Sequence, residues 1–310
     1  MRNTWTGLLL AGWVGLAAGC ATRPDVVAPT DSQMRQFASA GATAYRRGAV
    51  EEAAAMYQKA LDRAVLMDDS SAVARNGYHL ALCLVALGRP EAAHKLLEDV
   101  RAEAGYAGTV AGCADLVEAR VVRQAGDRET AISLAQRALE EMNRSGDRLY
   151  RVDAYLMLAD LACDGGDEAR ARAELSRAAT EVGGDSSVWA LAECERVGGR
   201  IEMLAGRALR AGAHFDKEAD LRRRAGRAKE MVTALLAAGA AYEKAPDLAR
   251  VADRYYRAAR SLLAGGEIDK AHSIALRAQE AARASGDERL AQRIEDLLRP
   301  AEPVAAPKSD

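Results

Sequence analysis

The chain has 310 residues, with 43 Lys and Arg against 45 Asp and Glu, which gives a formal net charge of −2. This balance excludes the strongly basic surface that binds nucleic acids and other polyanions. At this length we expect one or two globular domains, or one repeat array.

The first twenty residues differ from the rest of the chain. Met1-Arg2-Asn3 carries one positive charge, and Leu8–Ala18 then forms an apolar run that is too short to cross a bilayer as a helix. This pattern is typical of a secretory signal peptide. Ala17-Ala18-Gly19 is followed directly by Cys20, which resembles the lipobox of bacterial lipoproteins, with Leu16 one residue earlier than that family places its leucine. We therefore expect residues 1–19 to be a signal peptide.

The lipoprotein resemblance implies a lipid anchor on Cys20. Two or three acyl chains on one cysteine would hold the protein stably, whereas a single chain binds only marginally. Ala21 follows the cysteine where an aspartate would favour the inner membrane, so we expect the periplasmic face of the outer membrane. Anchoring to the inner membrane and a free periplasmic protein are the alternatives. Residues 20–32 contain two prolines and lack periodicity, which predicts a flexible tether.

Residues 33–298 are divided by turn-forming residues at intervals of about twenty. Between them lie about 16 to 18 residues with apolar positions at helical spacing, such as Tyr57, Ala60, Leu61 and Ala64. Glycine ends helices readily, and neighbouring aspartates and serines cap the next helix. The pattern predicts about fourteen antiparallel helices and an all-α fold. The turn positions are Gly48, Asp68-Asp69-Ser70, Gly88, Gly105 to Gly108, Gly126, Gly146, Gly166, Gly183-Gly184, Gly206, Gly226, Pro246, Gly265-Gly266 and Gly286.

Alternate turns are more alike than neighbouring ones, so the repeating unit is a helix pair of about 40 residues. In the first pair Gly41 is small, Tyr57 is large, and Ala53 and Ala60 are small again. This pattern resembles the tetratricopeptide repeat (TPR), a helix–turn–helix unit of 34 residues. The resemblance implies an α-solenoid of about seven TPR-like pairs over residues 33–298. Residues 299–310, with three prolines, are expected to be a disordered tail.

Four cysteines follow Cys20 without the spacing of a zinc site. They are either four small buried thiols or two disulfides in an oxidising periplasm, Cys83–Cys113 and Cys163–Cys194.

The TPR resemblance implies that the first helix of each pair lines a concave, partner-binding face. Projected onto this chain, that face carries arginines flanking aspartates, which predicts a patch that binds a charged segment of another protein. In the second interpretation these charges pair with each other across adjacent helices. The candidate partner-binding residues are Arg120, Arg123, Asp153, Asp160, Asp164, Arg196 and Arg200, with Arg35, Tyr45, Arg46, Arg75, Tyr78 and Glu193 at neighbouring projected positions.

No motif in the sequence indicates an enzyme, a metal site or a cofactor. The four histidines are scattered, and the chain lacks a nucleophile elbow, a P-loop and a dinucleotide fingerprint. The basic run at residues 221–230 is expected to complement the negative end of a helix dipole. The sequence therefore predicts a non-catalytic, lipid-anchored scaffold that binds another cell-envelope protein, of the pilus, secretin, barrel-assembly or cell-wall class. A self-associating structural lipoprotein without a separate client is the alternative.

Overall fold

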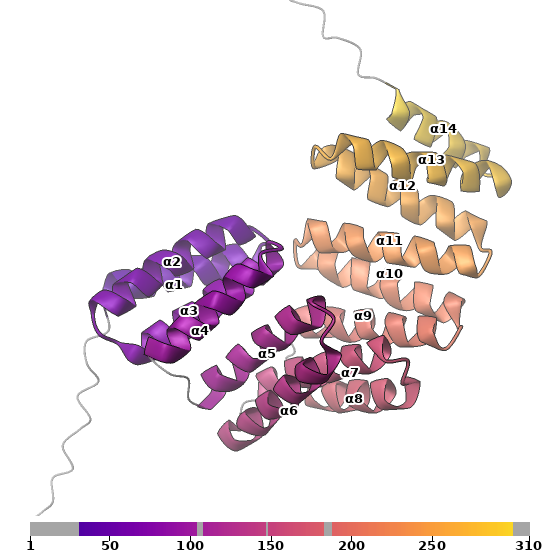
Figure 1. Cartoon of the computed structure of the whole chain (residues 1–310). Coiled ribbons are helices and arrows are strands. Elements are labelled where there is room, and N and C mark those ends of the chain that lie inside the picture. The colour runs from indigo at the N-terminus through magenta and orange to yellow at the C-terminus, as the bar shows by residue number, and fades with distance from the viewer. Residues whose placement is uncertain (1–30, 104–107, 147, 183–187, 300–310) are drawn as a thin grey trace, which may run out of the picture.

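The computed structural model describes residues 31–103, 108–146, 148–182 and 188–299. Across these residues it contains fourteen α-helices and no strand, as the turn pattern predicts (Figure 1). The expected signal peptide, Cys20 and the C-terminal tail from residue 300 lie outside the described residues. The seven pairs are α1 (Ser32–Arg46) with α2 (Val50–Leu66), α3 (Ser70–Ala86) with α4 (Pro90–Glu103), α5 (Gly108–Gln124) with α6 (Arg128–Ser145), α7 (Arg148–Asp164) with α8 (Glu168–Glu181), α9 (Val188–Leu204) with α10 (Ala208–Arg224), α11 (Ala228–Lys244) with α12 (Leu248–Ala264), and α13 (Ile268–Ala284) with α14 (Glu288–Leu298).

Local signals set the helix boundaries. Most turn glycines adopt positive φ, for example 83° at Gly48 and 71° at Gly206, a conformation that glycine reaches without the strain a Cβ would cause. Six helices begin at an aspartate whose carboxylate accepts a main-chain N–H of the first turn, as Asp127 does from Thr130 at 3.0 Å. The predicted division into glycine turns and aspartate caps is therefore confirmed.

Small residues let the helices of the array cross closely. A Cβ on Gly41 would lie 3.1 Å from the ring of Tyr57 on α2, and a Cβ on Gly239 of α11 would overlap the ring of Tyr255 on α12. Both tyrosines are buried, at 4% and 1% exposure. The small-and-large pattern that suggested the repeat is thus a packing requirement, because any side chain at either glycine would displace an aromatic ring.

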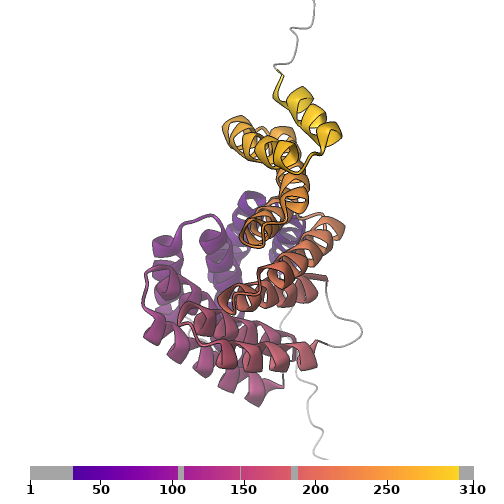
Figure 2. The same cartoon turned by 90° about the vertical axis from the view of Figure 1, so that its right-hand side faces the viewer.

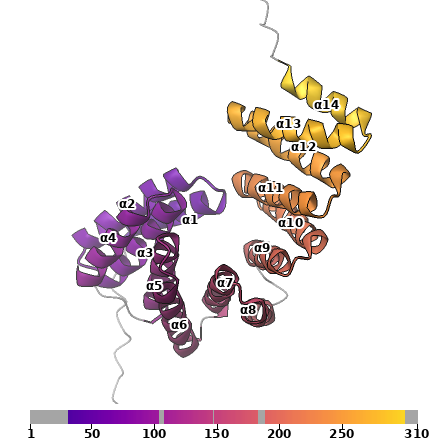
Figure 3. The same ribbon diagram turned by 45° about the vertical axis from the view of Figure 1, so that its right-hand side comes forward.

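The pairs stack into a curved array with the first helices on the inner side. Among them, α3 packs on α5, α5 on α7, and α7 on α9. Figure 3 shows these helices inside the curve and α2, α4, α6, α8 and α10 outside, and Figures 1 and 2 show α12–α14 projecting beyond it. Among the described residues, no helix is both long and apolar enough to cross a bilayer.

The curve closes where α11 meets α1. The guanidinium of Arg227, at the N-cap of α11, donates to the main-chain carbonyls of Tyr45 and Arg46, the second at 3.4 Å. The same group lies 5.4 Å from the centroid of the Tyr45 ring. A cation therefore sits on the negative end of the α1 dipole, joining residues 182 positions apart. We call this contact, made by Tyr45, Arg46 and Arg227, the seam.

Candidate partner-binding face

The seven predicted partner-binding residues lie on three neighbouring inner helices. Helix α5 provides two arginines and α9 provides the other two, while α7, which packs against both, provides the three aspartates. Spacings of three, four and seven residues place side chains on one face of a helix. The structure therefore brings all seven together, although they come from three different pairs.

Asp160 is the centre of this cluster. Its carboxylate accepts from Arg196 at 2.6 and 3.1 Å, from Arg200, and from Arg123 at 3.5 Å. Asp160 is only 4% exposed, so these three guanidinium groups replace the water that an ionised carboxylate needs. One helical turn further along, Asp164 accepts from Arg123 at 2.5 and 3.1 Å and from Arg200 at 2.5 Å.

Further ion pairs flank this cluster on α5, α7 and α9 and extend to the outer helix α10. Arg120 donates to Asp153 at 3.0 Å, and Arg196 also donates to Glu193 at 2.8 Å. On α10, Arg222 contacts both Glu193 and Glu218, the latter at 3.5 Å. We call the whole set the charge network. It contains five arginines and five carboxylates, namely Arg120, Arg123, Arg196, Arg200 and Arg222 with Asp153, Asp160, Asp164, Glu193 and Glu218.

Burial and the arginines act in opposite directions on the acids. Burial would raise the pKa of Asp160, but Arg196, Arg200 and Arg123 outweigh it, so that this pKa lies below its ordinary value. At Asp153 burial prevails over Arg120 and the pKa is raised. Burial also raises the pKa of Glu218 to about 7, because Arg222 only partly offsets it. The network therefore holds both firmly ionised carboxylates and one whose charge is costly near neutral pH.

The geometry contains the pairing across helices that the second interpretation describes. It also leaves part of each inner arginine accessible, since the side chains of Arg120, Arg123, Arg196 and Arg200 are 26 to 29% exposed. A guanidinium has five N–H donors, so these groups can still donate to carboxylates or main-chain carbonyls of a bound segment. The arrangement can therefore bind carboxylates or carbonyls, through arginines that their ion pairs hold in fixed orientations.

Of the other projected positions, Glu193 belongs to the charge network, and the remaining five lie outside it. Arg35, Arg46 and Arg75 are exposed, and within the described ranges none of them forms an ion pair with a carboxylate. Tyr78 is buried, and Tyr45 belongs to the seam.

Three residues that the sequence did not assign to the partner-binding face complete the arrangement. Glu218 and Arg222 are spaced four residues apart on α10, which is a recognisable helical ion pair, but the contact from Arg222 to Glu193 on α9 carries no local signal. Arg227 belongs to the basic run at residues 221–230, which was expected only to complement the dipole at the end of its own helix. Instead it contacts α1, and Arg222 of the same run is buried at 4% exposure.

The four cysteines are free thiols in the structure, so the two-disulfide alternative does not describe it. Burial raises the pKa of Cys83 to about 12 and that of Cys194 to about 11, which keeps both protonated and weakly reactive. No group of His, Cys, Asp and Glu among the described residues could hold a metal ion.

Similarity to solved structures supports the fold. No family model and no curated protein matches the chain. A signal-transduction ATPase with a tetratricopeptide-repeat sensor from Pyrococcus horikoshii is similar, with a TM-score of 0.62 and 16% identity over 81% of this chain and 39% of that one. This chain therefore spans about two fifths of that protein.

Two Rap proteins have similar structures. The apo form of RapI gives a TM-score of 0.57 at 9% identity, over 84% of this chain and 74% of that one. A Rap protein complexed with competence and sporulation factor gives 0.57 at 12% identity, over 85% and 97%. At these identities the similarity establishes the fold, which is a TPR-like solenoid of antiparallel helix pairs.

Proposed function

We propose that the protein is a non-catalytic, lipid-anchored scaffold whose inner face binds a segment of another cell-envelope protein. The observation that carries this proposal is the continuous inner face of α3, α5, α7 and α9, with its ordered and partly exposed arginines. Repeat solenoids use such faces to bind partners. The fold supports the proposal as well, since one protein with a similar structure has been solved in complex with a factor.

The anchor would determine where this face operates. An acyl-modified Cys20 confines the solenoid to a membrane surface and raises the local concentration of any partner there. Ala21, next to the cysteine, favours the periplasmic face of the outer membrane. A self-associating structural lipoprotein is the second candidate, in which the end helices rather than the inner face form the contacts.

Replacing Cys20 by serine is expected to release the protein from the membrane, or to leave the signal peptide uncut. The reason is that the acyl chains supply the anchoring energy, about 0.8 kcal/mol per buried methylene. Membrane fractionation with detection of the protein measures this outcome. Cys83→Ser, at a buried free thiol, is the matched control and should stay with the membranes. If Cys20→Ser fractionates like the parent protein, the proposal of a lipid anchor is wrong. The proposal that the inner face binds a partner is then tested by the crosslinking experiment alone.

A photo-crosslinking residue at position 75 on α3 is expected to capture a partner in cells, whereas one at position 136 on the outer helix α6 is not. Both positions are exposed, so they differ mainly in which face of the solenoid they probe, the inner or the outer one. In the protein with the crosslinker at position 75, the further substitution Arg200→Ala should reduce capture about ten-fold, because a charge-assisted hydrogen bond to the partner is lost. Mass spectrometry of the adducts identifies the partner.

Arg223→Ala is the control for that experiment, because Arg223 is 59% exposed on α10 and, within the described part of the chain, pairs with Asp220 on the same helix alone. Capture that is equal at positions 75 and 136 would place the interface elsewhere. Capture only of a second copy of the chain would support the structural alternative.

A further inference from the structure

A pocket of about 420 Å³ opens between α11 and α13, beside the last turn of α12. Its floor is apolar and consists of Val232 and Leu236 from α11, Leu262 from α12 and Ile274 from α13. Val232 and Leu262 are each 8% exposed and belong to the packed core, so the floor is fixed rather than loosely exposed. This volume is sufficient for one large aliphatic or aromatic side chain and the backbone beside it.

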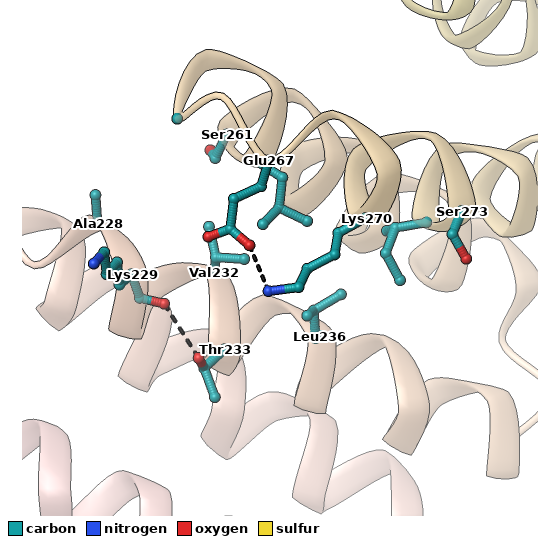
Figure 4. Close-up of a pocket in the computed structure, with 12 residues that line it drawn as sticks. Ala228, Lys229, Val232, Thr233, Leu236, Ser261, Glu267, Lys270 and Ser273 are labelled. Atoms are coloured by element: carbon teal, nitrogen blue, oxygen red, sulfur yellow. Dashed lines mark hydrogen bonds and ion pairs between the residues drawn. The ribbon is translucent and has the colours of Figure 1, made fainter. Parts of the chain in front are cut away.

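Polar side chains surround the mouth of this pocket. Figure 4 shows Lys270 paired with Glu267 on the α13 side of the opening. The distance from Nζ to Oε2 is 2.5 Å. Lys229 lies at the opposite side of the mouth, and Thr233 donates its hydroxyl to the main-chain carbonyl of Lys229 at 3.2 Å. Within the residues that the structure describes, no ion pair involves the Lys229 ammonium group. Lys270 is thus paired with Glu267, whereas Lys229 forms no ion pair, although its charge also helps to lower the pKa of Glu267.

Three helix ends meet at the mouth of the pocket. Helices α11 and α13 are parallel and both begin here, and their N-cap residues, Arg227 and Glu267, provide no side-chain hydrogen bond to the first turn. The positive ends of α11 and α13 therefore face this region, and the negative end of α12, at Gly265, lies beside them. The pocket combines an apolar floor with a mouth that carries two lysines against one glutamate.

The pocket also adjoins the seam. Ala228, which lines it, follows Arg227 directly, and Arg227 holds the end of α1. Arg46 at that end is exposed and adds a second cation that is not paired with a carboxylate within the described chain. A bound segment leaving the inner face past α11 would reach this pocket next.

We propose that the pocket binds an acidic–apolar segment of the partner protein: one large apolar side chain fills it, and a flanking carboxylate pairs with Lys229. This inference rests on the proposed protein-binding function and specifies the chemistry of the partner. The carboxylate would approach an ammonium group that forms no ion pair within the described residues, at a mouth where two lysines face one glutamate, whereas a basic segment would meet the same cations and be repelled.

Titration of the full chain in nanodiscs with fluorescein-labelled hexapeptides tests the proposal by fluorescence polarisation. We expect DEFLDE to bind at least about ten-fold more tightly than KRFLKR, which reverses the charges, and than DEGSDE, which lacks the apolar pair. Lys229→Glu and the pocket-filling Ser273→Trp should each weaken DEFLDE about ten-fold. Lys244→Glu, at the other end of α11, should leave its affinity unchanged. Lys229, Lys244 and Ser273 are not buried, so these variants keep the core intact.

The proposal is overturned if DEGSDE binds as tightly as DEFLDE, or if Ser273→Trp has no effect on DEFLDE. Binding of octanoate in the pocket without binding of DEFLDE would also overturn it, because the occupant would then be a free amphiphile. These outcomes are distinct from failure of the proposed function. Crosslinking at position 75 that survives Lys229→Glu would keep the inner face as the interface and reject only the pocket.

Discussion

Replacing Asp160 by alanine is expected to lower the free energy of unfolding by about 3–5 kcal/mol. The carboxylate is 4% exposed and receives Arg123, Arg196 and Arg200 from two neighbouring helices. Its removal leaves three guanidinium groups close together, with only Asp164 and Glu193 to neutralise them. Like-charge repulsion and lost hydrogen bonds then act on the interfaces of α7 with both α5 and α9.

Urea unfolding followed by circular dichroism measures this effect. Asp220→Ala is the matched control, because Asp220 is 52% exposed and pairs with Arg223 on its own helix. An exposed pair contributes about 0–1 kcal/mol, so this control should hardly change the midpoint. Equal effects of the two substitutions would mean that the buried carboxylate does not organise the inner face.

Replacing Glu218 by glutamine is expected to stabilise the protein by about 1–3 kcal/mol at pH 8 and to have little effect near pH 4. The pKa of Glu218 is raised from 4.5 to about 7, chiefly by burial. The folded state therefore keeps a proton that the unfolded chain releases between these values. This contribution to stability is fully present below pH 4.5 and is lost as the pH rises through about 7. Glutamine stays neutral throughout, and Arg222 keeps its contact with Glu193.

The measurement is the difference in unfolding free energy between the parent protein and Glu218→Gln from pH 4 to pH 8. Acids such as Asp160 show the opposite trend, because a lowered pKa contributes stability that is lost as the pH falls. Both proteins contain these acids, so taking the difference cancels their contribution. Glu280→Gln, on the exposed side of α13, is the control and should show a flat difference. A difference that is largest at pH 4 would contradict the assignment of a neutral, buried Glu218.

The helices could be predicted from the sequence because each boundary has a nearby cause. Gly48 supplies a left-handed turn, Asp127 caps the helix that follows it, and Gly41 makes room for Tyr57 sixteen residues later. The gathering of the arginines and aspartates on one face was predictable for a related reason. Once the pairs stack in register, equivalent positions of successive first helices become neighbours.

The remaining features depend on contacts without a local signal. The sequence predicts that Asp160 lies near arginines, but not that three guanidinium groups converge on it. The contact of Arg222 with Glu193 depends on how closely α10 crosses α9. The pocket arises from the space left between α11 and α13, which no single residue encodes. The seam depends on the accumulated curvature of five pairs, so that a small change in each crossing would separate Arg227 from α1.

The seam changes how this solenoid should unfold. In an open array each unit contacts only its neighbours, so both terminal units can fray independently of the middle. Here Arg227 ties the end of α1 to the beginning of the sixth pair, and the first pair cannot detach without breaking a contact across 182 residues. Such a contact forms late, after the intervening pairs have stacked, because its loop-closure entropy is otherwise unfavourable. The free end is then α13–α14, beyond the closed part of the array, and local unfolding begins there rather than at the first pair.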